Sequence, residues 1–133
     1  MKLSETRFAI QNEMDVAHAV LQTGTFCAAL GFDKSRSQMV VTAVSELARN
    51  IVKFASLGEL VLRTVTRGVS KGVEAVADDQ GPGIEDLEQA MQDHFSSSGT
   101  LGLGLPGVKR IMDEFEIESE PGRGTRVTIR KWL

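Results

Sequence analysis

Residues 39–54 read Met-Val-Val-Thr-Ala-Val-Ser-Glu-Leu-Ala-Arg-Asn-Ile-Val-Lys-Phe, and this segment carries the strongest structural signal in the chain. Its apolar side chains recur at helical spacing, at Met39, Val40, Ala43, Val44, Leu47, Ile51 and Phe54. One broad apolar stripe of this kind predicts an amphipathic helix that packs against a core. Asp33 or Ser35 is placed to cap its first turn, and Gly58 ends the pattern.

The segments on either side of this helix predict the rest of the fold. Short runs that favour extended structure predict strands over 7–11, 59–67, 72–78, 116–120 and 125–132. Other segments favour helices over 15–30, 84–94 and 106–115, with Gly31 as a C-cap and Pro106 in a first turn. This order predicts an α+β fold in which a single layer of mixed β-sheet carries helices on one face. We expect residues 1–133 to form one such domain.

Composition and charge argue against several classes of function. The chain has 133 residues, 41% apolar and 25% charged, which fits one folded domain. A formal net charge of −3 lacks the basic footprint of a nucleic-acid-binding protein. No apolar run is long enough to span a bilayer, and the polar start does not resemble a signal peptide. We therefore expect a cytoplasmic protein that binds neither nucleic acid nor membrane, with the lone Cys27 as a buried structural thiol.

Glu46 and Asn50 lie four residues apart in the predicted helix, so their side chains stack on one face beside the apolar stripe. A solvated face with a Glu46–Arg49 ion pair would explain them without any function. Alternatively, the Asn50 amide oxygen suits Mg²⁺, a hard cation that takes oxygen ligands together with phosphate. Glu46 would then be free to deprotonate an attacking hydroxyl group.

The sequence Asp79-Gln80-Gly81-Pro82-Gly83 follows a predicted strand. An ordinary strand-ending turn is one explanation of this composition. In a binding site, Asp79 would be a buried carboxylate that accepts a hydrogen bond from an adenine amino group. Gly81 and Gly83 would let the backbone approach the base closely. Asp78 could take this part instead, although the spacing to the glycines favours Asp79.

A glycine-rich segment, Gly99-Thr100-Leu101-Gly102-Leu103-Gly104, leads into the helix predicted from Pro106. Backbone amides and the positive end of a helix dipole suit phosphate at such a junction, whereas a mobile surface loop is the alternative. The P-loop pattern is excluded because Leu105 follows Gly104 where that pattern needs Lys. A dinucleotide fingerprint at Gly102, Gly104 and Gly107 is excluded because no strand is predicted before it.

The last motif is Gly122-Arg123-Gly124-Thr125. A tight hairpin with glycines in left-handed conformations explains the glycines. In a binding site, the Thr125 hydroxyl would hydrogen-bond near the adenine, directly or through a water molecule.

Taken in order, the motifs Glu-x-x-x-Asn, Asp-x-Gly-x-Gly, the glycine-rich loop and Gly-x-Gly-Thr resemble those of the GHKL superfamily of ATPases and kinases. The resemblance covers the region from about 40 to 128. The segments 45–50, 79–84 and 105–115 look like those of the RsbT-type switch serine/threonine kinases of the bacterial stressosome. The fold that this implies is a Bergerat-type ATP-binding sandwich.

The resemblance also implies a role for each motif. Glu46 would be the general base toward a substrate Ser or Thr hydroxyl, and Asn50 the Mg²⁺ ligand. Asp79 and Thr125 would hold the adenine of ATP, and the segment 99–104 would cradle its phosphates. The implied substrates are STAS-domain scaffold proteins of the stressosome. After phosphorylating them, such a kinase leaves the complex and activates a downstream partner, often a phosphatase.

One departure from the family pattern concerns positive charge. Related anti-sigma kinases place an Arg just before the glycines of the nucleotide lid, whereas residues 96–101 contain no basic residue. Phosphoryl transfer needs positive charge near the γ-phosphate. Lys53 matches a position where histidine kinases often carry a phosphate-binding lysine, so we expect it to substitute, with Lys109 or Arg110 next. Ordinary surface charge is an equal explanation of these three side chains.

Two other functions stay open on the sequence alone. A nucleotide-regulated anti-sigma or adaptor module would bind ATP only to set its affinity for a partner. A transferase that acts on a partner's histidine would leave an acid-labile phosphate on its product.

Overall fold

The computed structural model describes residues 5–83 and 104–133. Its strands are β1 (Glu5–Ile10), β2 (Gly58–Arg67), β3 (Ser70–Asp79), β4 (Glu114–Glu120) and β5 (Gly124–Trp132). Its helices are α1 (Glu13–Leu30), α2 (Lys34–Asn50), the π-helical turn η1 (Ile51–Ala55) and α4 (Gly104–Ile111). The predicted helix over 84–94 lies outside the described residues.

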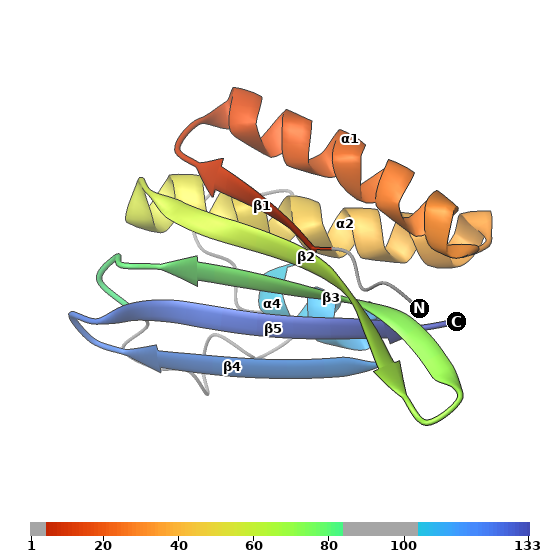
Figure 1. Ribbon diagram of the computed structural model, residues 1–133. Coiled ribbons are helices and arrows are strands. Elements are labelled where there is room, and N and C mark those ends of the chain that lie inside the picture. The colour runs from red at the N-terminus through yellow and green to blue at the C-terminus, as the bar shows by residue number, and fades with distance from the viewer. Residues whose placement is uncertain (1–4, 84–103) are drawn as a thin grey trace.

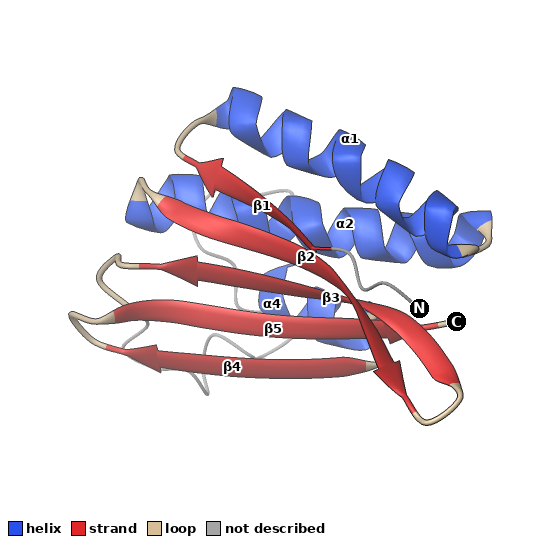
Figure 2. Cartoon of the chain, viewed as in Figure 1, coloured by secondary structure: helices blue, strands red, loops and turns tan. Residues whose placement is uncertain are grey.

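The five strands form one sheet in the order β1-β2-β3-β5-β4 (Figure 1). Helices α2 and α4 cover one face of this sheet, and α1 packs alongside α2 near the β1 edge (Figure 2). The α+β class with helices on one face is confirmed. The expected mixture of strand directions is not found among the described strands, because every pairing is antiparallel. Two tight hairpins, β2–β3 and β4–β5, account for two of these four pairings, since a short turn can join only antiparallel strands.

Capping residues bound α1 and α2, and the sequence analysis predicted two of them, Gly31 and Asp33. The Asn12 side chain accepts a hydrogen bond from the Asp15 amide at 3.0 Å and starts α1, and Gly31 caps the other end of this helix with a φ of 96°. Asp33, one of the two predicted caps, accepts from the Arg36 amide at 2.8 Å and starts α2. Cys27 is fully buried, and burial raises the pKa of its thiol to about 11. The structural role predicted for Cys27 is therefore supported, because a reactive cysteine needs an accessible thiolate.

Helix α2 does not continue to Phe54 as the apolar stripe predicted. It ends at Asn50 and is followed by η1, after which Ser56 takes a left-handed φ of 69°. Phe54 keeps 48% of its surface exposed and so does not extend the buried stripe. Periodicity missed this change because a π-turn adds one residue per turn without changing the composition.

The predicted C-terminal helix is also shorter than expected. Helix α4 ends at Ile111, and Phe115 lies in β4 opposite Ile129 of β5. Asp113 lies between α4 and β4, and it is tied to β5: its carboxylate accepts a hydrogen bond from the Trp132 amide at 2.8 Å and pairs with Lys131. Long-range pairing with β5 therefore overrides the local helical pattern.

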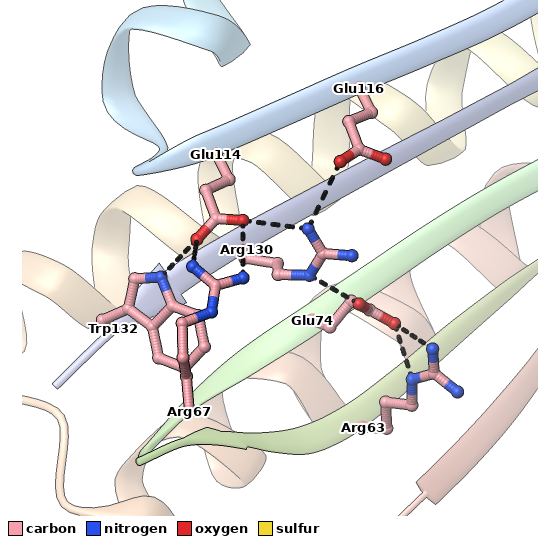
Figure 3. A network of polar contacts seen from close by, with 7 residues as sticks. All are labelled: Arg63, Arg67, Glu74, Glu114, Glu116, Arg130 and Trp132. Carbon is pink, nitrogen blue, oxygen red and sulfur yellow. Dashed lines mark hydrogen bonds and ion pairs between the residues drawn. The ribbon is translucent and has the colours of Figure 1, made fainter. Parts of the chain in front are cut away.

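The sheet face opposite the helices carries a network of alternating charges (Figure 3). Glu74 lies on this face of β3, yet only 2% of its surface is exposed. Arg63 from β2 and Arg130 from β5 both pair with its carboxylate and lie on either side of it. A buried charge of this kind is tolerated because both of its oxygens are hydrogen-bonded to cations.

Glu114 on β4 extends this network toward the end of the sheet (Figure 3). Its carboxylate accepts from Arg67 at 2.7 Å, from Trp132 Nε1 at 2.7 Å and from Arg130 at 2.9 Å. These contacts, with the Arg67 hydrogen bond as the largest cause, lower the pKa of Glu114 from 4.5 to about 2. The Arg67 guanidinium also lies 4.7 Å from the centre of a Trp132 ring, so β2, β4 and β5 are joined here.

None of the helices among residues 5–83 and 104–133 is long and apolar enough to cross a membrane.

Candidate functional site

A row of four residues crosses the helix-facing side of the sheet at one end. In the strand register, Gly58 lies opposite Asp79, Asp79 opposite Thr125, and Thr125 opposite Ser119. Side chains alternate between the two faces of a strand, so Asp79 shares its face with the buried Ala77 and Ala75. The structure therefore brings together the second and fourth predicted motifs, which are 46 residues apart in the sequence.

The Asp79 carboxylate is held by the backbone around it. Its Oδ1 atom accepts from the Gly81 amide at 2.9 Å and from the Thr125 amide at 3.3 Å. Asp78, the alternative left open by the sequence, points to the opposite face and pairs with Arg126 at 2.8 Å. The geometry therefore favours Asp79 over Asp78 as the ligand-binding carboxylate.

The loop after β3 is pressed against the β4–β5 turn, and three glycines make this contact possible. A Cβ atom at Gly83 would overlap the Glu120 carbonyl oxygen, and one at Gly124 would overlap the Asp79 carbonyl oxygen. Gly122 donates its amide hydrogen to the Pro82 carbonyl at 2.7 Å. Both Gly83 and Gly124 also have positive φ, at 77° and 96°. The glycines thus place the backbone of the two motifs in direct contact.

The end of α2 and the turn η1 reach the same end of the sheet. A Cβ atom at Gly58 would lie 2.7 Å from Ile51 and 3.1 Å from the Cβ of Asp79. Gly58 therefore leaves room for Ile51 to pack beside Asp79. Asn50 ends α2 immediately before Ile51, and Glu46 lies one turn earlier; both side chains are half-buried. The first motif is thereby placed next to the second.

Three basic residues were expected near the phosphates, and the structure places them on two elements. Lys53 lies in η1, with its ammonium group 5.1 Å from the centre of the Phe54 ring. Lys109 and Arg110 lie in the last turn of α4, and all three residues are exposed. A position in η1, three residues after Asn50, keeps Lys53 close to the candidate metal ligand.

The glycine-rich loop is described only at its end. Gly99, Thr100, Leu101, Gly102 and Leu103 lie outside the described residues, so their predicted contacts with phosphate stay predictions. Gly104 starts α4 with a φ of 68°. The first turn of α4 is anchored, because Pro106, Gly107 and Val108 are buried. The helix N-terminus that would face a phosphate is therefore fixed to the core.

Ser119 was missed by the sequence analysis. Its hydroxyl lies 2.8 Å from Thr125 Oγ1 and 3.1 Å from the Gly124 carbonyl oxygen. Serine is too common in strands and turns to stand out alone. Counting back across the Gly-x-Gly turn would have placed Ser119 opposite Thr125, and this register was the available signal.

Comparison with known proteins agrees with this arrangement. Residues 9–131 match the family model described as histidine kinase-like ATPase domain. The serine/threonine-protein kinase RsbT of Bacillus subtilis is 44% identical over 124 residues, 93% of each chain. An anti-sigma F factor of Thermoanaerobacter is 34% identical over 100 residues, 71% of this chain and 68% of that protein.

Solved structures share the fold. The RsbU and RsbW domains of a Mycobacterium tuberculosis protein align with a TM-score of 0.67 at 19% identity, over 98% of this chain and 32% of that one. The mycobacterial sensor histidine kinase MprB aligns with a TM-score of 0.56 at 18% identity, over 97% of both chains. The resemblance inferred from the order of the motifs is confirmed: this chain belongs to the histidine kinase-like ATPase family.

Proposed function

We propose that the protein is an ATP-dependent protein serine/threonine kinase built as one nucleotide-binding domain. The observation that carries the proposal is the meeting of Asp79 and Thr125 in one row, beside the end of the helix that holds Glu46 and Asn50. The 44% identity with a serine/threonine-protein kinase over 93% of both chains supports the same activity. An ATPase-family fold supplies the nucleotide site, and Glu46 is the group that makes transfer to a protein hydroxyl possible.

In this proposal Asp79 and Thr125 hold the adenine, and the segment from Gly99 to Gly104 holds the phosphates. Asn50 would hold Mg²⁺, because it is a half-buried residue whose amide oxygen is a hard donor one helical turn from Glu46. When bound, Mg²⁺ supplies positive charge that neutralises the phosphate oxygens. Lys53, in the turn that follows Asn50, adds a further positive charge on the protein side.

Glu46 performs the proton transfer. Its carboxylate accepts the hydroxyl proton of a substrate Ser or Thr while that oxygen bonds to the γ-phosphorus of ATP. The bond between the γ-phosphorus and the bridging oxygen breaks, and ADP leaves with the electron pair. The products are a phosphorylated Ser or Thr, ADP and a protonated Glu46 that returns its proton to solvent.

For the substrates we propose STAS-domain scaffold proteins of a bacterial stressosome, with a phosphatase or another signalling effector as the downstream partner. The similarity to RsbT supports this choice. The test mixes the protein with radiolabelled ATP, Mg²⁺ and a STAS-domain protein, followed by mapping of the phosphorylated residue. Glu46→Gln should retain ATP binding and lose most phosphate transfer.

Glu116→Gln is a matched control for that experiment, because Glu116 is an exposed carboxylate on the opposite face of the sheet. It should transfer phosphate like the wild type. Equal transfer by Glu46→Gln and the wild type would show that Glu46 is not the base.

A second candidate is a nucleotide-regulated anti-sigma or adaptor module without strong kinase activity. Two observations favour it: the 34% identity with an anti-sigma F factor and the lack of a basic residue in 96–101. A pull-down that retains a partner only with Mg-ATP, with no phosphate on that partner, would select this function over the kinase.

A further inference from the structure

Helix α1 has apolar residues on two opposite faces. Its inner face is buried and consists of Val16, Ala19, Thr23 and Cys27. On the outer face Met14 and Leu21 keep 81% and 69% of their surfaces exposed, and α1 lies at the outside of the helical layer (Figure 1). A helix that is apolar all round is normally buried all round. The outer face therefore has the composition of a packing surface, and no element of the described part of the chain covers it.

The outer face also has the spacing by which one helix packs along another. Its exposed residues follow one another at alternating steps of four and three: Met14, His18, Leu21, Thr25 and Ala28. This is the pattern of a coiled-coil seam over two heptads. His18 rests against the Phe8 ring of β1, with the ring centres 5.6 Å apart. The Thr25 hydroxyl lies 3.4 Å from the Leu21 carbonyl oxygen of its own helix, so it needs no polar partner across the seam.

The outer face of α1 carries no formal charge along most of its length. Residues 16–30 contain no Asp, Glu, Lys or Arg, although these four types make up 25% of the chain. Helix α2, in contrast, exposes Lys34, Arg36 and Arg49. A helix face that stays in water is normally polar and charged. The composition of α1 is thus typical of a face that another apolar surface covers.

This face is complementary to itself when two copies of α1 run antiparallel. A two-fold axis at Leu21 places that residue against its own copy. His18 then lies beside Thr25 of the other copy, and Met14 beside Ala28. Each larger side chain away from the axis meets a smaller one, as close packing requires. A parallel pair would instead place Met14 against Met14 and Ala28 against Ala28, which crowds one end and leaves a gap at the other.

The charges at the two ends of α1 favour the same arrangement. Glu13 is the first residue of α1, and Lys34 follows the short turn after the last residue of α1; both are exposed. Antiparallel copies bring the first turn of one helix next to the last turn of the other. Glu13 of one copy and Lys34 of the other then approach with opposite charges. Complementary charges of this kind fix the register of an interface.

We propose that the outer face of α1 binds a second copy of this chain in an antiparallel, two-fold symmetric dimer. An 18-residue helix is about 27 Å long and about 10 Å wide. A contact of this size is at the low end of protein interfaces, so the dimer should be reversible, with a dissociation constant of roughly 1–100 µM. The inference goes beyond the proposed kinase activity and does not depend on the nucleotide site.

Sedimentation velocity of the full chain over a series of concentrations measures the dimer. Leu21→Asp places two carboxylates against each other at the axis and should raise the dissociation constant at least about tenfold. Val69→Asp is the matched control, because Val69 is a fully exposed apolar residue at the turn between β2 and β3. It should dimerise like the wild type. At low concentration all three proteins should melt at the same temperature, which shows that each is folded.

Disulfide trapping tests the antiparallel register. Cys27 is fully buried, so its thiol does not compete. A mixture of the Met14→Cys and Ala28→Cys variants should form a mixed disulfide on mild oxidation, whereas Met14→Cys alone should not form one. The charges at the ends are tested by reversal. Glu13→Lys and Lys34→Glu should each weaken the dimer, and the two changes together should restore it.

A wild type that stays monomeric up to about 1 mM would overturn the inference. A dimer that Leu21→Asp leaves intact would do the same, because the interface would then lie elsewhere. Disulfide formation by Met14→Cys alone would contradict the antiparallel arrangement. Hydrogen exchange gives the remaining outcome: protection of α1 only after another protein is added would assign this face to that protein and exclude the second copy.

Discussion

A Cβ atom at Gly81 would lie 2.6 Å from the Cβ of Ala55 and 2.9 Å from its Cα. The loop that holds Asp79 in place and the turn that follows Asn50 are therefore in van der Waals contact, with no room for a larger residue at position 81. Because Gly81 also donates its amide hydrogen to Asp79, one small residue joins the expected adenine side of the site to the expected phosphate side.

Gly81→Ala should separate these two sides. The added methyl group has to displace η1 or the loop, at a cost of about 1–3 kcal/mol. We expect ATP affinity to fall at least about tenfold, with a lower melting temperature, measured by calorimetry and thermal unfolding. Gly24→Ala in α1 is the matched control, because its Cβ would make only an ordinary 3.9 Å contact with Val41. It should stabilise the protein by about 0.5–1 kcal/mol and leave ATP binding intact.

Asp79→Asn and Asp78→Asn form a pair that tests which carboxylate binds the base. Hydrogen bonds to a charged group contribute about 1.5–3 kcal/mol, so Asp79→Asn should weaken ATP binding by roughly 10-fold to 100-fold. Asp78→Asn breaks a partly exposed ion pair with Arg126 and should cost at most about 1 kcal/mol of stability. Its ATP affinity should equal that of the wild type. The reverse pattern in a nucleotide titration would assign the site to Asp78.

Glu114 makes the free energy of unfolding depend on pH in the acidic range. Its pKa is lowered from 4.5 to about 2 in the folded protein, so the folded state holds this proton less tightly than the unfolded state does. The contribution of Glu114 to the free energy of unfolding is therefore fully present above about pH 4.5 and is lost as the pH falls through about 2. Denaturant unfolding measured between pH 6 and pH 2 should show this loss.

Glu114→Gln should flatten the acid dependence and cost about 1–2 kcal/mol at pH 7, because charge-assisted hydrogen bonds become neutral. Glu118→Gln serves as the comparison, since Glu118 is exposed on the same strand. An unchanged acid profile in Glu114→Gln would mean that other carboxylates control acid unfolding.

Lys53→Ala tests the source of positive charge near the phosphates. Loss of a charged contact to phosphate should weaken ATP binding by about tenfold or more, whereas adenosine binding should not change. The dependence of ATP affinity on salt should also become less steep. Lys34→Ala removes the same charge at the exposed start of α2, the end of the helix opposite Asn50, and should have little effect on ATP affinity. If both variants bind ATP alike, Lys109 and Arg110 become the next residues to test.

Several parts of the structure could be read from local sequence. The caps at Asp33 and Gly31 act on neighbouring residues, so they were identified correctly. The apolar stripe of α2 was also correct, since residues three and four apart share one face of any α-helix. Two predictions of helix length were wrong. The π-helical turn η1 replaces the last turn of α2 without any change in composition, and Phe115 belongs to β4 because β5 pairs with it.

The motifs, their order and the family could be identified from the sequence alone, because they depend on residue types and spacing along one chain. Strand pairing and packing were needed to show that Asp79 and not Asp78 faces the helices, that Gly81 touches Ala55, and that Ser119 contacts Thr125. The placements of Asp79 and Ser119 depend on strand register, and a shift of one residue would turn every side chain to the opposite face. The register of β3 with β5 is set by pairing across 46 residues of chain, which no local pattern encodes.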